Sequence, residues 1–263
     1  MLEGMSSRAG ILVRSAAARA VPGRAFAVVM RAIYPRIEPE LACIEDWVPR
    51  GGTALDVGAW YGPWTARLLG IADHVVTIEA NPELARVVRA GLPRTRLIEG
   101  AASDADGTAN LYLPGGGRGA EGLASLEHQT DRSVTVRRLT IDSLGLTDVR
   151  FIKMDIEGHE PAALRGAEQT IRRDSPALLL ELETRHQPVD QVTGMLTGWG
   201  YQGRVLADGK WAPLDDFDLA GHQRANARVA ERGLISRLAR PSDRYINSVL
   251  FIRAADRRSA PVP

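Results

Sequence analysis

The chain has 263 residues, 44% hydrophobic and 25% charged, which is ordinary for a soluble globular protein of one large α/β domain or two small ones. Its formal net charge of +1 gives no reason to expect a nucleic acid partner. The single cysteine, Cys43, excludes an internal disulfide framework and a cysteine-based metal site, and it suits a reducing compartment, so we expect a cytoplasmic protein.

Residues 1–48 read as a basic, helical N-terminal extension. Residues 1–36 hold six arginines and one acid, Glu3, for a local net charge of +5. No apolar run approaches the about 20 residues that a membrane span needs. Helical spacing of apolar residues predicts an amphipathic helix that either packs on the domain or makes a peripheral membrane contact: Phe26, Val29, Met30 and Ile33.

Strands and helices alternate through the rest of the chain, and we assign residues 49–253 to one domain. We expect strands at 53–57, 74–79, 95–100, 149–155, 177–183 and 245–253, and helices at 64–70, 81–93, 161–173 and 189–200. This alternation predicts a parallel sheet with helices on both faces. Residues 104–139 predict a hairpin insertion, and residues 201–214 a second hairpin with an Asp-Gly turn. We expect 254–263 to be a disordered tail.

Ligands of such sheets bind beyond the carboxyl ends of the strands, so the residues there carry the chemistry. The first strand ends in a D-x-G-x-x-x-G turn made by Asp56, Gly58 and Gly62. Trp60 occupies the position where a dinucleotide fingerprint has its middle glycine, which argues against an NAD(P)-dependent oxidoreductase. Glu79 ends the next strand and can accept hydrogen bonds from both hydroxyls of a ribose. The pattern therefore favours a nucleoside ligand without a bound pyrophosphate.

Five ordered stretches resemble successive motifs of the FkbM-type S-adenosylmethionine-dependent methyltransferases: LDVGAWYGPWT, VVTIEANPE, LIEGAASDADGTANLYL, FIKMDIEGHEPAALRGAEQTI and ALLLELETRH. The resemblance runs from about residue 50 to 253. It implies a class I methyltransferase fold, that is, a Rossmann-like, seven-stranded, mostly parallel sheet in the order 3-2-1-4-5-7-6. It also implies S-adenosylmethionine as the cofactor.

The same resemblance implies roles for individual residues. The methionine end of the cofactor would be lined by Asp56, Gly58, Ala59, Tyr61 and Gly62. Glu79 would hold the ribose, with Ala80 and Asn81 beside it. The adenine would be flanked by Ala101, Ala102 and Ser103. From its place at the end of a strand, Asp155 is also assigned to the cofactor site, where it would orient cofactor or substrate if it does not bind a metal.

The resemblance further implies methylation of oxygen by in-line displacement, for which the proton of a hydroxyl must be removed. One route is a general base, and His186, after the strand at 177–183, is our candidate. Asp155 and Glu181 are the other catalytic candidates, at neighbouring strand ends. The second route is a Mg²⁺ ion that acidifies the hydroxyl, with Asp155, Glu181 and Glu183 as its ligands.

The expected acceptor is a hydroxyl of a sugar, an oligo- or polysaccharide or a glycosylated metabolite. A polyketide-type natural product is the alternative acceptor, and a non-catalytic cofactor-binding relative is an alternative function. The loop 114–122 and the segment 208–240 are candidate lids over the site. A homodimer is also kept as an expectation.

Overall fold

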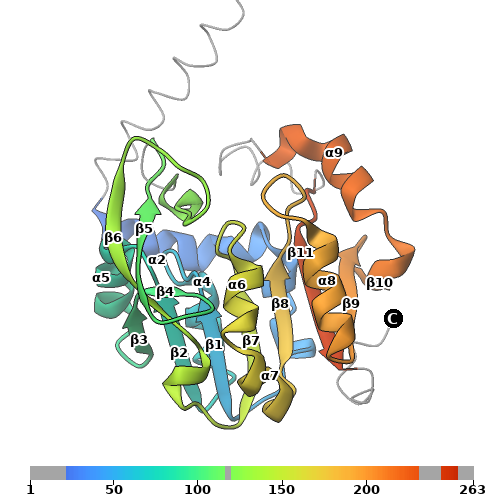
Figure 1. Ribbon diagram of the computed structural model, residues 1–263, viewed down its shortest axis with the longest axis horizontal. Coiled ribbons are helices and arrows are strands. Elements are labelled where there is room, and N and C mark those ends of the chain that lie inside the picture. Colours follow the sequence, from blue (N-terminus) through green and yellow to red (C-terminus); the bar gives the residue numbers. More distant parts are fainter. Residues whose placement is uncertain (1–21, 116–119, 231–243, 254–263) are drawn as a thin grey trace, which may run out of the picture.

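The computed structural model describes residues 22–115, 120–230 and 244–253 (Figure 1). Eight strands form one mixed sheet. Their spatial order is β10 (Lys210–Pro213), β9 (Tyr201–Ala207), β11 (Ser248–Arg253), β8 (Ala177–Glu181), β7 (Val149–Met154), β1 (Thr53–Val57), β2 (His74–Glu79) and β3 (Arg96–Glu99). The predicted α/β fold with a mostly parallel sheet is confirmed, but the sheet has eight strands instead of seven because β10 pairs with β9 at the edge.

Helices cover both faces of the sheet (Figure 1). One face carries α6 (Glu160–Arg165), α7 (Glu168–Asp174) and α8 (Val189–Gly198). The other face carries α2 (Gly23–Ile33), α3 (Pro39–Ala42), α4 (Pro63–Leu68) and α5 (Pro82–Gly91). Side chains of β1 alternate between the two cores, since Leu55 and Val57 pack on the α6–α8 side and Ala54 on the α3–α4 side.

Close backbone approaches explain two glycines near the carboxyl edge of the sheet. Gly58 has φ +79°, and a Cβ built there would lie 1.8 Å from the carbonyl oxygen of Asp155. At Gly166 a Cβ would lie 1.9 Å from the carbonyl oxygen of Ser103. Gly166 also ends α6, so the helix predicted at 161–173 is two helices, α6 and α7.

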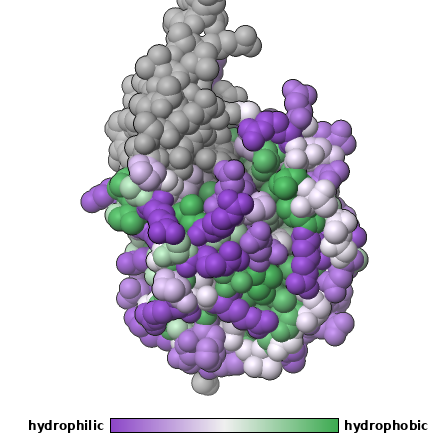
Figure 2. All heavy atoms as spheres, turned by 90° about the vertical axis from the view of Figure 1, so that its left-hand side faces the viewer, coloured by the Kyte–Doolittle hydropathy of each residue, from purple (hydrophilic) through white to green (hydrophobic). Residues whose placement is uncertain are grey.

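A smaller sheet stands beside the carboxyl edge and consists of β4 (Ala101–Ala102), β5 (Gly107–Tyr112) and β6 (Ser133–Leu139). Strands β5 and β6 pair antiparallel within the segment 104–139. The hairpin predicted at 201–214 is confirmed, because β9 and β10 pair antiparallel around Asp208 and Gly209. Figure 2 shows the side of the molecule that carries β6 and α5, where apolar patches are separated by hydrophilic side chains.

The remaining elements are α9 (Leu219–Ala230) and the short helices η1 (Tyr34–Arg36), η2 (Ile44–Asp46), η3 (Ala120–Leu123), η4 (Asp142–Leu144) and η5 (Leu214–Asp216). Of the segment 208–240, residues up to 230 are described and form β10, η5 and α9. Part of the loop 114–122, the end of 208–240 and the tail 254–263 lie outside the described residues. Within the described ranges, no helix has the length and apolarity needed to cross a membrane.

Candidate active site

The carboxyl end of β2 places Glu79 between two backbone amides. Its Oε2 accepts a hydrogen bond from the amide of Trp60 and its Oε1 one from the amide of Asn81, each at 2.8 Å. Burial raises the pKa of Glu79 to about 7, and the two amide hydrogen bonds oppose that rise. Each carboxylate oxygen keeps a second lone pair, so Glu79 can accept a further pair of hydrogen bonds from a diol.

The end of β1 buries a second carboxyl group, Asp56. Its Oδ2 accepts a hydrogen bond from the Thr65 hydroxyl at 2.5 Å, while its Oδ1 has no hydrogen-bond partner among the described residues. Burial raises the pKa of Asp56, and the charge of Lys153 on β7 lowers it. Lys153 donates to Asp155 Oδ2 at 3.1 Å. Burial alone would lower the pKa of Lys153, but the surrounding carboxylates raise it above its ordinary value, so Lys153 is a fixed cation.

The residues of the glycine turn after β1 differ in their surroundings. Ala59 is buried at the turn, and Trp60 adopts a left-handed φ of 52°. The Tyr61 ring, however, is buried against Met30 of α2 and Leu84 of α5. Gly62 caps α4 and lies against the Arg31 guanidinium of α2. Tyr61 and Gly62 therefore both contact α2, and their assignment to the cofactor stays a prediction.

The residues predicted to flank the adenine belong to the small sheet or follow it directly, since Ala101 and Ala102 form β4 and Ser103 comes next. Ala80 and Ala101 belong to one apolar cluster, and Ala102 is buried behind them. Asn81 caps α5 by accepting a hydrogen bond from the amide of Glu83. Ser103 is fully buried, and its hydroxyl lies 3.0 Å from His159 Nε2, whose Nδ1 contacts Glu127 of the insertion at 2.6 Å. This contact ties the insertion to the loop after β7.

The ends of β7 and β8 bring the predicted catalytic carboxyl groups together. Burial, the charge of Asp155 and a hydrogen bond with it raise the pKa of Glu181 well above its ordinary value. Asn247 donates to both Glu181 and Glu183, and Arg185 pairs with Glu183. No group of three or more His, Cys, Asp or Glu side chains in the described part of the chain is placed to hold a metal ion. The Mg²⁺ prediction for Asp155, Glu181 and Glu183 therefore gains no support.

His186 lies beyond the end of β8 and is oriented by a carboxyl group. Its Nδ1 is 3.0 Å from Glu157 Oε2, and its Nε2 is 3.9 Å from Glu183 Oε2. The hydrogen bond with Glu157 raises the pKa of His186, and partial burial opposes that rise. The His128 ring of the insertion lies 4.6 Å from the His186 ring, centroid to centroid. An imidazole held at Nδ1 by a carboxylate is the arrangement of a general base that works at Nε2.

Sequence reasoning missed the group that shapes the loop between β7 and α6. Glu160 is fully buried and accepts hydrogen bonds from the amides of Ile156 and Gly158, at 2.9 and 3.1 Å, and from the Gln187 side chain at 2.8 Å. Burial raises the pKa of Glu160 to about 7. The signal was present, since a second acid follows Glu157 by three residues at the start of a helix.

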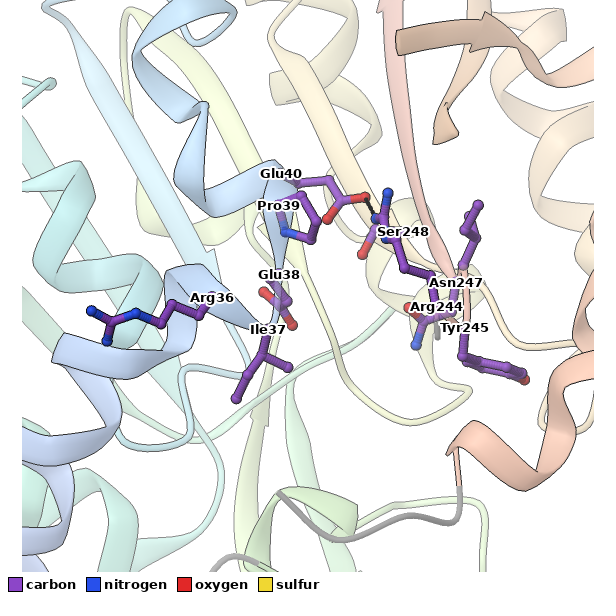
Figure 3. A pocket seen from close by; sticks show the side chains of 10 residues that line it. Arg36, Ile37, Glu38, Pro39, Glu40, Arg244, Tyr245, Asn247 and Ser248 are labelled. Carbon is purple, nitrogen blue, oxygen red and sulfur yellow. Dashed lines mark hydrogen bonds and ion pairs between the residues drawn. The ribbon is translucent and has the colours of Figure 1, made fainter. Parts of the chain in front are cut away.

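A polar pocket lies between the N-terminal segment and the start of β11, next to Glu181 and Glu183 (Figure 3). Its walls are residues 36–40 and residues 244–248. Glu40 and Arg244 form an ion pair across the pocket at 3.0 Å. Glu38 accepts a hydrogen bond from Trp64 Nε1 at 2.6 Å, and its charge is felt by Lys153 and Asp155. Sequence reasoning did not anticipate this pocket, because its walls are about 200 residues apart in the chain.

The fold is an α/β fold with a mostly parallel sheet, and the candidate site residues lie along the carboxyl edge of that sheet. Residues 54–202 match the family model of the methyltransferase FkbM domain. The match covers more than half of the chain, so the chain belongs to the FkbM methyltransferase family. The alternative of an NAD(P)-dependent oxidoreductase is thereby set aside. No curated protein matches the sequence.

Several solved structures are similar to this one, including the following three. The FkbM methyltransferase from Methylobacillus flagellatus KT shares 21% identity over 62% of this chain and 42% of its own, with a TM-score of 0.46. Precorrin-8W decarboxylase from Methanobacterium thermoautotrophicum shares 12% sequence identity over 81% of this chain and 89% of its own, with a TM-score of 0.45. A TehB-like SAM-dependent methyltransferase from Corynebacterium glutamicum shares 15% sequence identity over 69% of this chain and 84% of its own, with a TM-score of 0.38. The chain thus spans less than half of the first structure, and the family assignment rests on the sequence match.

Proposed function

We propose that the protein is an S-adenosylmethionine-dependent O-methyltransferase whose acceptor is a hydroxyl of a sugar, an oligo- or polysaccharide or a glycosylated metabolite. One observation carries the proposal: the carboxyl edge of one sheet presents both Glu79, with lone pairs open to a diol, and His186, held by the carboxyl group of Glu157. Membership of a methyltransferase family supports it. Glu79 suits the binding of a nucleoside, and His186 suits the removal of a hydroxyl proton.

The residues at the ends of β1 and β2 fit a nucleoside that carries a sulfonium. Glu79 would accept hydrogen bonds from the ribose hydroxyls. The buried Asp56 Oδ1, unpartnered among the described residues, and the neighbouring carboxyl groups favour positive charge in a ligand. Ala80, Ala101 and Ala102 would provide small apolar walls for a base. When bound, the cofactor supplies an electrophilic methyl group.

The chain's own chemistry centres on His186. Its Nε2 would take the proton of the acceptor hydroxyl, and the positive charge that forms on the ring would be stabilised by Glu157 at Nδ1. Lys153 holds Asp155 in place, and burial and the charge of Asp155 raise the pKa of the neighbouring Glu181. Asp155 and Glu181 would orient the acceptor through hydrogen bonds.

Transfer of tritium from S-adenosyl-[methyl-³H]methionine to a panel of methyl glycosides and phenols tests the proposal. The wild type should label a glycoside, and His186→Ala should lower turnover about 10²- to 10⁴-fold with unchanged affinity for S-adenosylhomocysteine. His74→Ala is the matched control, because His74 opens β2 at the opposite edge of the sheet and is exposed. Labelling of phenols alone would favour the polyketide-type acceptor. Full activity of His186→Ala would refute the role of this base.

A second proposal concerns a peripheral membrane contact, which one feature of α2 favours. Val28 and Val29 are 64% and 50% exposed on this helix, next to the exposed Arg24. Apolar side chains beside arginines suit an anionic membrane surface. Cosedimentation with phosphatidylserine vesicles should fall when both valines are changed to Asp, whereas Leu123→Asp, at another exposed apolar position, should have no effect. Equal sedimentation of all three proteins would refute the contact.

A further inference from the structure

The pocket between residues 36–40 and 244–248 borders the reaction centre. Asn247 lines the pocket and donates hydrogen bonds to Glu181 and Glu183. Tyr245 also lines it, and burial and the charge of Glu183 raise the pKa of Tyr245 to about 12. On the opposite wall, Glu38 lies close enough to Lys153 and Asp155 for their charges to interact. A group held in this pocket is therefore adjacent to the carboxyl groups at the ends of β7 and β8.

The lining of the pocket is predominantly polar and carries both charge signs. Seven of its ten residues have polar side chains, and only Ile37, Pro39 and Ile246 do not. Figure 3 shows Arg36 pointing away from the other labelled side chains. Glu40 and Arg244 neutralise each other, and Arg244 also donates to the backbone carbonyl of Leu206 at 2.8 Å. This pair holds the two walls together, so Glu38 is the acidic side chain left for a ligand, and burial raises its pKa to about 7.

Glu38 is a hydrogen-bond acceptor with one oxygen fixed. Trp64 Nε1 holds its Oε2 at 2.6 Å, and Oε1 forms no hydrogen bond with any residue in the described ranges. Glu38 lies outside the stretch 54–202 that matches the family model. A carboxyl group held in place by one partner accepts hydrogen bonds from hydroxyl groups with little loss of side-chain entropy.

We propose that this pocket is the acceptor subsite, that it takes a neutral polyhydroxylated group, and that Glu38 accepts hydrogen bonds from its hydroxyls. The inference rests on the proposed O-methyltransferase function, because it assigns the acceptor of that reaction to this pocket. Hydroxyl groups both donate and accept, so they satisfy Glu38, Asn247 and Ser248 together. An apolar polyketide skeleton would leave these groups without partners, and sites of this kind reject such ligands strongly. The N-terminal segment thus completes the acceptor site of the family domain.

Saturation-transfer difference NMR of the full chain with S-adenosylhomocysteine and a set of methyl glycosides tests the subsite, with 2-naphthol as an apolar probe. The wild type should bind at least one glycoside in preference to 2-naphthol. Glu38→Gln keeps the size and the acceptor for Trp64, and it should weaken glycoside binding about tenfold. Glu45→Gln is the matched control, because Glu45 is an exposed acid of the same segment outside the pocket. It should bind the glycoside as the wild type does.

Calorimetry with S-adenosylhomocysteine separates this inference from the proposed function. Glu38→Gln should bind the nucleoside with unchanged affinity, which also shows that the variant is folded. A wild type that binds S-adenosylhomocysteine but no glycoside, or that prefers 2-naphthol, overturns the subsite and leaves the cofactor assignment intact. Equal glycoside binding by the wild type and Glu38→Gln overturns the role of Glu38. Glycoside binding without nucleoside binding contradicts the proposed function but supports the subsite.

Discussion

The contact between Glu157 and His186 makes a prediction that separates a general base from a histidine that merely fills space. Glu157→Gln keeps the size of the side chain and removes its charge. The Nδ1–Oε2 distance is 3.0 Å, and the two side chains are 17% and 11% exposed, so solvent weakens the interaction little. A hydrogen bond to a charged group in such a place contributes about 1.5–3 kcal/mol. Because it stabilises the imidazolium that forms in the transition state, we expect kcat to fall about 10- to 100-fold.

The pH dependence gives the second part of the prediction. The hydrogen bond with Glu157 raises the pKa of His186, burial lowers it, and the nearby Glu183 and Arg185 act in opposite directions. The base is active when neutral, so activity rises with pH through this pKa. Glu157→Gln should move the acidic limb of the kcat profile to lower pH. Initial rates of methyl transfer across the neutral range measure it, with the exposed Glu168→Gln as control. An unmoved limb with an unchanged rate would refute the assignment.

Three further predictions concern other buried carboxyl groups. Glu79→Ala should weaken S-adenosylhomocysteine binding by about 1–3 kcal/mol in calorimetry, because charged hydrogen bonds are lost; unchanged affinity would mean that the ribose binds elsewhere. Glu160→Ala should lower the free energy of unfolding by about 3 kcal/mol or more in urea titrations, since Ile156, Gly158 and Gln187 lose their acceptor, and a loss below about 1 kcal/mol would contradict that. The free energy of unfolding should also fall as pH rises from 4.5 to about 7, because Glu79 and Glu160 lose their protons in the unfolded chain first. Each group contributes at most about 3 kcal/mol to this fall, and a rise in stability over the same window, measured by urea titration at several pH values, would be inconsistent with the raised pKa values.

The sequence predicts well those features whose cause is local. Asn81 and Pro82 start α5 as expected, because a cap and a first-turn proline act within one turn of the helix. Asp208 and Gly209 form the hairpin turn between β9 and β10, since both adopt the positive φ values that the turn needs. The strand-end carboxylates also follow from the alternation of strands and helices, because parallel strands bring their carboxyl ends to one edge.

Features that depend on distant segments could not be predicted from the sequence. Tyr61 was assigned to the cofactor, yet its ring packs on α2, about 30 residues earlier in the chain. Glu38 and Asn247 line the same pocket from the two ends of the chain, and no local sequence pattern predicts that either residue lies there. His128 reaches His186 only because the insertion folds back over the loop after β7. Pairings of this kind are set by tertiary packing, which overrides what neighbouring residues indicate.

Calorimetric titration of the purified full-length chain with S-adenosylhomocysteine tests the central claim most directly, with NAD as the control ligand. A nucleoside site built on Glu79 predicts saturable binding at about micromolar concentration, roughly −8 kcal/mol, and no heat from NAD. Absence of nucleoside binding together with saturable binding of NAD would contradict the account.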